Sequence, residues 1–209
     1  MGGLFTKAAD DAGRAITLFA VAAIGTFIAL LMALARAPAC TQEQSQPMQP
    51  VKFDHRHHVR DDGVDCLYCH SEATSTRFAT VPPTSVCLGC HAQIWTKSPA
   101  LEPVRAMKPI AWERVTSLPD FVYFDHHAHT KRGVGCSECH GRVDLMPQVV
   151  KAAPLTMGFC LGCHRDPAPH LRPLDRITDM EWRDDVDVGR RVMRELHVKP
   201  STNCTGCHR

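Results

Sequence analysis

The sequence predicts a mainly α-helical and irregular protein with almost no sheet, in which one N-terminal transmembrane helix precedes a cofactor-filled domain. Three observations support this fold class. One long segment near the N-terminus carries no charge. The remaining chain lacks large apolar residues, since aromatic residues make up only 6% of the protein. Ten of the 11 cysteines form C-x-x-C pairs. A bound group must therefore supply the interior that side chains do not.

The uncharged segment runs from Ala15 to Ala35 and is long enough to cross a bilayer. It exceeds the apolar stretch of a cleaved signal peptide, and Arg36 follows it directly. We therefore expect residues 15–36 to form an uncleaved anchor. Lys7 and Arg14 favour a cytoplasmic location for residues 1–14.

Residues 37–50 are rich in Pro, Gln and Ser and predict a linker. Cys40 lies in this stretch after an Ala-Pro-Ala sequence that is similar to a lipoprotein processing site. Arg36 opposes that interpretation, so we interpret Cys40 as a lone thiol without a role. The cofactor domain is expected to span residues 51–209.

This domain contains a duplication. Its two units, 51–91 and 121–164, each begin with F-D-H-x-x-H and each contain two C-x-x-C-H motifs. A fifth motif lies at 204–208. We number the motifs 1 to 5 along the chain: Cys66–His70, Cys87–His91, Cys136–His140, Cys160–His164 and Cys204–His208. Regular structure is expected to be short around them, with one longer helix within residues 180–197.

C-x-x-C-H is the attachment signature of c-type haem, in which both sulfurs bond the porphyrin and the histidine binds iron. A zinc interpretation would leave all five histidines unexplained. We therefore predict five covalent c-type haems. The attachment residues are Cys66, Cys69, Cys87, Cys90, Cys136, Cys139, Cys160, Cys163, Cys204 and Cys207, and the proximal ligands are His70, His91, His140, His164 and His208. Covalent haem attachment takes place outside the cytoplasm, so the domain is expected on the periplasmic side of the inner membrane.

The repeated H-x-x-H pairs, His55/His58 and His126/His129, are the predicted distal ligands. Positions i and i+3 lie on adjacent faces of one helical turn, so each pair can reach two haems. Four distal histidines leave one haem without a second ligand. Met146 is the favoured fifth distal ligand, with Met157 and His197 as alternatives.

The F-D-H-x-x-H pairs, the run Leu155–Arg165 and the ending Thr202–Arg209 resemble the pentahaem cytochrome subunit of alternative complex III. The H-x-x-H part is shared with class III-like multihaem cytochromes. The resemblance implies a respiratory complex that oxidises quinol and passes electrons through iron–sulfur clusters to this subunit. It also implies three kinds of partner: an iron–sulfur subunit of the molybdopterin-enzyme family, polytopic quinol-binding membrane subunits, and a monohaem cytochrome c or soluble acceptor.

The expected role is electron transport within a quinol:acceptor oxidoreductase, without enzyme activity of the chain on its own. Two alternatives stay open: a membrane-anchored quinol dehydrogenase, and a multihaem reductase acting on nitrogen oxides. The formal charge of +2 and the absence of a basic stripe argue against a nucleic-acid partner.

Overall fold

The computed structural model describes residues 6–208 and separates into two compact units, one up to Gln42 and one from Glu43 onward. The first unit contains α1 (Lys7–Ala35) and the one-turn helix α2 (Pro38–Thr41). Thr6 caps α1 by accepting a hydrogen bond from the backbone N–H of Ala9. Helix α1 thus begins eight residues before the uncharged segment. An exposed i,i+4 ion pair between Asp10 and Arg14 (2.8 Å) lies on this added part.

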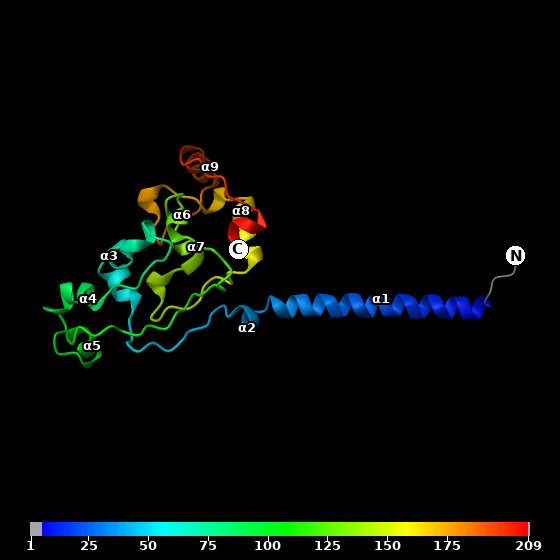
Figure 1. The fold of residues 1–209 in the computed structure, drawn as a ribbon, viewed down its shortest axis with the longest axis horizontal. Helices are drawn as coiled ribbons and strands as arrows, with labels where there is room; N and C mark the ends of the chain where they lie inside the picture. Colours follow the sequence, from blue (N-terminus) through cyan, green and yellow to red (C-terminus); the bar gives the residue numbers. More distant parts are fainter. Residues whose placement is uncertain (1–5, 209) are drawn as a thin grey trace. The chain divides into compact units, whose positions relative to one another are not determined.

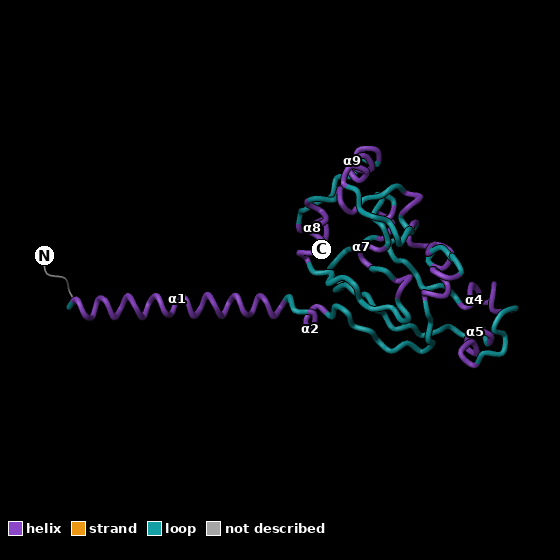
Figure 2. The backbone as a smooth tube through the Cα atoms, turned by 180° about the vertical axis from the view of Figure 1, so that it is seen from behind, coloured by secondary structure: helices purple, strands orange, loops and turns teal. Residues whose placement is uncertain are grey.

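The second unit consists of short helices joined by irregular segments (Figures 1 and 2). Within residues 43–208, β-type pairing is limited to two isolated bridges. The mainly helical and irregular fold is therefore confirmed. The helices are the π-turn η1 (Arg56–Asp61), α3 (Cys66–Cys69), η2 (Ser71–Thr74), α4 (Thr84–His91), η3 (Pro99–Leu101), α5 (Glu102–Arg105), α6 (His126–Thr130), α7 (Ser137–His140), η4 (Val143–Leu145), α8 (Met157–Arg165), η5 (Ala168–His170), η6 (Leu174–Arg176), α9 (Val186–Glu195) and α10 (Cys204–Cys207).

The side-chain core is small and lies beneath α9. Leu171, Val192 and Val198 form its buried centre, and α9 packs closely against η5. Gly189 permits this approach, because a Cβ at that position would lie 1.7 Å from the carbonyl oxygen of Ala168. Helix α9 is the longer helix expected within 180–197. It begins only at Val186, because the Asp185 side chain accepts hydrogen bonds from the first-turn amides.

Residues 44–49, which the sequence places in the linker, belong to the second unit and are hydrogen-bonded to other parts of it. The amide of Gln44 donates to the carbonyl of Lys151 (2.8 Å), and the amide of Lys151 donates to that of Ser45 (3.1 Å). The side chain of Gln49 donates to the carbonyl of Glu113 (2.9 Å). These bonds order the second half of the expected linker as part of the domain.

Candidate haem sites

Each C-x-x-C-H motif occupies a single helical turn, in α3, α4, α7, α8 and α10. Backbone hydrogen bonds close the turn. For example, the amide of His70 donates to the carbonyl of Cys66, and the amide of His208 donates to that of Cys204, both at 2.8 Å. Asp65 caps motif 1 by accepting from the amide of Leu67 (2.8 Å). A helical turn brings residues i, i+3 and i+4 to one side, so two thiols and one imidazole can face a single macrocycle. All ten motif cysteines are free thiols, as covalent haem attachment requires.

The structure brings three distal candidates opposite the histidine of a motif. The ring centroids are 6.2 Å apart for His58 and His91, 6.3 Å for His126 and His140, and 6.1 Å for His129 and His164. The rings of His126 and His140 are nearly parallel, at 8°.

The spacing of these pairs can be compared with that of two imidazoles bound to one metal. Two imidazoles bound to opposite faces of one metal, with metal–nitrogen bonds of about 2 Å, have centroids about 6 Å apart. The three pairs therefore have the spacing that iron with two histidine ligands requires. Among residues 6–208, no three His, Cys, Asp or Glu side chains are grouped to hold one metal ion.

Backbone carbonyls hold the Nδ1 atoms of five of these six rings, all but His140, and also that of His70. A carbonyl can only accept a hydrogen bond, so Nδ1 carries the proton and Nε2 keeps the lone pair that binds iron. The pairs are His58–Asp54 (3.0 Å), His129–Asp125 (2.7 Å), His126–Arg77 (3.2 Å), His70–Thr80 (3.0 Å), His91–Ile94 (3.3 Å) and His164–Ser201 (2.7 Å). This contact fixes the orientation of each ring, and it fixes the tautomer of every ring but His126, whose Nδ1 also lies 3.4 Å from the amide of Ala79.

His55 occupies the position in the first unit that His126 occupies in the second. Burial and, after it, the nearby His70 lower the pKa of His55 to about 4. Its buried Nδ1 has no hydrogen-bond partner. Burial likewise lowers the pKa of His140 to about 4, with His126 as the next cause. Both imidazoles are thus kept neutral, the form in which histidine binds a metal. The duplication and the proximity of His70 favour His55 as the distal candidate for the haem of motif 1.

Two phenylalanines, which the sequence interpretation did not assign, position the H-x-x-H pairs. Phe53 stacks on His58 at 4.4 Å and meets His55 edge-on at 4.7 Å. In the second unit, Phe124 stacks on His129 at 4.5 Å and meets His126 edge-on at 4.8 Å. The repeated F-D-H-x-x-H sequence carried this signal, because the phenylalanine recurs with the histidines. Each ring limits the rotation of two distal candidates at once.

The fifth motif has a different environment. The ring of His208 lies 5.7 Å from that of Phe121, and the amide of Tyr123 donates to the carbonyl of Cys207 (2.8 Å). The Met146 methyl group lies beside Gly141, 3.4 Å from the position a Cβ there would take. Met157 is 67% exposed, and His197 is also exposed. The assignment of Met146 as the fifth distal ligand stays a prediction.

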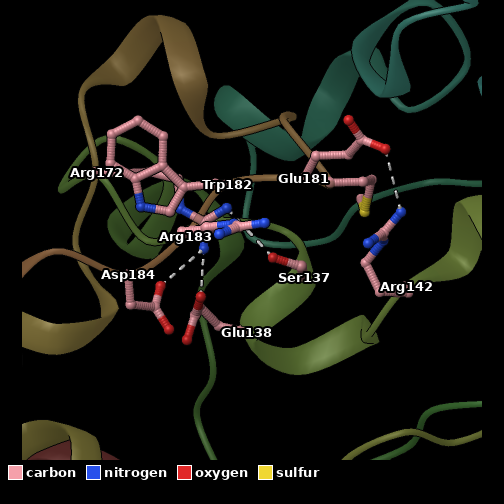
Figure 3. A pocket seen from close by; sticks show the side chains of 9 residues that line it. Ser137, Glu138, Arg142, Arg172, Glu181, Trp182, Arg183 and Asp184 are labelled. Atoms are coloured by element: carbon pink, nitrogen blue, oxygen red, sulfur yellow. Dashed lines mark hydrogen bonds and ion pairs between the residues drawn. The ribbon is translucent and has the colours of Figure 1, made fainter.

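A polar pocket of about 640 Å³ lies behind motif 3 (Figure 3). Its buried wall contains Arg172, which is 1% exposed and forms an ion pair with Glu138. Arg172 also donates to the Ser137 hydroxyl (3.2 Å) and to the Asp179 carbonyl (3.1 Å). Ser137 and Glu138 are the two residues between the motif cysteines, so Arg172 fixes the turn that carries motif 3. No motif or spacing in the sequence indicated a role for this arginine.

Comparison with known proteins finds similarity to c-type cytochromes. Residues 122–209 match the family of cytochrome c7 and related cytochrome c. A segment of 101 residues is 37% identical to the multihaem cytochrome c subunit of menaquinone reductase from Nitratidesulfovibrio vulgaris. The matched segment covers 46% of this chain and 47% of that relative, so the chain matches about half the length of the relative.

Proposed function

Because the chain contains a multihaem cytochrome c domain with c-type haem as its cofactor, we propose that it is the electron-transfer subunit of a membrane complex that oxidises quinol. Five haems are attached at the ten motif cysteines. The motif histidines are the proximal ligands, and His55, His58, His126 and His129 are distal ligands. Met146 completes the fifth site. The observation that supports this proposal most directly is the set of histidine ring pairs at 6.1–6.3 Å.

Bound haem iron supplies one-electron chemistry. The protein residues keep the imidazoles neutral and leave Nε2 of each ring available to bind iron. Where two histidines face each other, both axial positions of the iron would be occupied. A site closed on both faces transfers electrons but binds no substrate. This geometry favours a relay over a multihaem reductase acting on nitrogen oxides, which needs an open iron position.

The membrane setting rests on two observations. Helix α1 (Lys7–Ala35) is long and apolar enough to span a membrane. The sequence resembles the pentahaem subunit of alternative complex III, and the curated relative is a subunit of a menaquinone reductase. We therefore propose a single-pass protein of the inner membrane with its haem domain on the periplasmic side. Its partners are an iron–sulfur subunit of the molybdopterin-enzyme family, polytopic quinol-binding subunits, and a cytochrome or terminal oxidase that accepts the electrons.

The relative also favours a second candidate function, in which the same haems relay electrons toward quinone and not away from quinol. A menaquinone reductase delivers electrons to quinone, and this chain would then carry electrons inward from a soluble donor. The two functions differ only in which partner reduces the haems.

The direction can be tested on the complex purified in mild detergent. The mass of the chain should exceed that of its residues by five haems. We expect a quinol analogue to reduce the haems of the oxidised complex and to leave those of the isolated chain oxidised, because the quinol site belongs to the membrane partners. If quinol reduces none of the haems and added quinone reoxidises haems prereduced by a soluble cytochrome, the reductase function replaces the proposal. Reduction of the isolated chain by quinol would instead support a quinol dehydrogenase.

A further inference from the structure

The contacts between motifs follow an order that differs from the order along the chain. Motifs 1 and 3 meet at residues 177–178. The amide of Cys136 donates to the carbonyl of Ile177 (2.9 Å), and the thiol of Cys66 lies 4.0 Å from the carbonyl of Thr178. The thiols of Cys66 and Cys136 also contact each other, and this hydrogen bond is the main cause of the raised pKa of Cys66. The first cysteines of two distant motifs are therefore neighbours.

Each H-x-x-H turn joins two further motifs. His58 faces motif 2, while His55, on the same turn, is influenced electrostatically more by His70 of motif 1 than by any other residue. In the second unit, His126 faces motif 3 and His129 faces motif 4. Two ligands three residues apart on one turn require the two irons to be close. Motifs 1 and 2 are thus adjacent, and motifs 3 and 4 are adjacent.

The C-terminal motif connects to motif 4. The Nδ1 atom of His164 donates to the carbonyl of Ser201 (2.7 Å), three residues before motif 5. Burial raises the pKa of Cys160, and the thiol of Cys207 is the next cause. Motif 4 is therefore hydrogen-bonded to the segment that leads into motif 5, and the cysteines of the two motifs are close enough to interact electrostatically.

From these junctions we propose that the five haems form one line in the order 2–1–3–4–5. The haems of Cys87–His91 and Cys204–His208 are then the terminal positions, where electrons enter and leave. Figures 1 and 2 show α4, which carries motif 2, and the C-terminal end of the chain on opposite sides of the domain, with α7 between them. The inference rests on the proposed loading of all five motifs, and it adds the order of transfer and the two docking ends.

The line can be tested by changing one distal ligand and measuring the potential of every haem. Methionine in place of a distal histidine raises the potential of the haem that it binds. In a His58→Met chain, the haem of motif 2 is reduced first, and its added electron opposes reduction of its neighbours. We expect the potential of the haem at motif 1 to fall by about twice as much as that at motif 3, because a Coulomb interaction halves when the distance doubles. The haem at motif 5 should show the smallest change.

The measurement uses the full-length holoprotein in detergent, poised at successive potentials, with the haem methyl resonances resolved by NMR. His57→Met is the matched control, because His57 lies on the same turn but is 61% exposed and pairs with Asp61. It should shift no haem. A His129→Met chain provides the second variant, in which the haems of motifs 3 and 5 should shift by similar amounts and that of motif 2 should show the smallest change.

A shift at motif 4 or 5 in His58→Met that equals the shift at motif 1 would overturn the order. If the variant lost the haem of motif 2, the loss of that neighbour should still alter the haem of motif 1 most. The result is independent of the quinol experiment, since no partner or quinone is present. A holoprotein mass below five haems would instead refute the loading on which both proposals rest.

Discussion

The buried ion pair behind motif 3 allows a quantitative prediction for Arg172→Leu. Arg172 is 1% exposed and Glu138 is 15% exposed, so neither charge is well solvated in the folded protein. The substitution removes the arginine but leaves the carboxylate beneath the turn of motif 3. It also removes the bonds from Arg172 to Ser137 (3.2 Å) and to the Asp179 carbonyl (3.1 Å). The carboxylate keeps one partner, because Nδ1 of His170 lies 2.8 Å from its other oxygen. We therefore expect the free energy of unfolding to fall by about 3 kcal/mol, the lower end of the cost of breaking a buried ion pair.

The assay is denaturant unfolding of the full-length holoprotein in detergent at neutral pH. The haem Soret band reports unfolding, because it changes when the distal ligands detach. Arg190→Leu is the matched control, since Arg190 forms an exposed ion pair with Asp187 (3.1 Å) and its loss should cost at most about 1 kcal/mol. An Arg172→Leu/Glu138→Leu double variant should recover part of the loss, because both charges are then absent. If Arg172→Leu and Arg190→Leu unfold at the same denaturant concentration, the argument from burial is wrong.

Two further predictions concern the ligand set and pH. Met146→Ala should convert one of the five haems to a high-spin form that binds carbon monoxide, as seen by electron paramagnetic resonance and absorbance; an unchanged low-spin spectrum would exclude Met146 as a ligand. Asp144→Asn should lower the free energy of unfolding at pH 7 by about 1–2 kcal/mol, because it removes a charge-assisted hydrogen bond from Arg142. That bond holds the pKa of Asp144 below its ordinary value of 3.8, so the wild-type advantage should be complete above pH 3.8 and decline as the pH falls below it. If the difference in free energy of unfolding between the wild-type protein and Asp144→Asn did not change across this range, the Arg142–Asp144 bond would not be the cause of the lowered pKa.

The parts of the site that the sequence predicts are those with local chemistry. A c-type haem needs two thiols and an imidazole within five consecutive residues, so motif spacing alone identifies Cys66, Cys69 and His70 and their counterparts. The duplicated F-D-H-x-x-H identifies the distal candidates, because two copies of an i,i+3 pair are a repeated local feature. The apolar run from Ala15 to Ala35 predicts helix α1 by composition.

Element boundaries were less predictable, since capping side chains decide them. Helix α1 begins at Lys7 because Thr6 caps it, and α9 begins at Val186 because of Asp185. The second half of the expected linker is ordered by bonds to residues more than a hundred positions away, such as that between Gln44 and Lys151. Composition identifies a linker but contains no information on such partners.

The assignment of distal histidines to motifs and the order of the motifs in space are decided by tertiary structure. The sequence shows that His58 and His129 can each reach a second haem, but their pairing with His91 and His164 joins positions more than 30 residues apart. The Arg172–Glu138 pair and the contact between Cys66 and Cys136 also join distant positions. The sequence by itself therefore determined where the C-x-x-C-H and H-x-x-H motifs lie and predicted their haem chemistry, because that chemistry is local. Only the folded chain decided which motif lies next to which, because those neighbours are set by packing between segments that are remote along the chain.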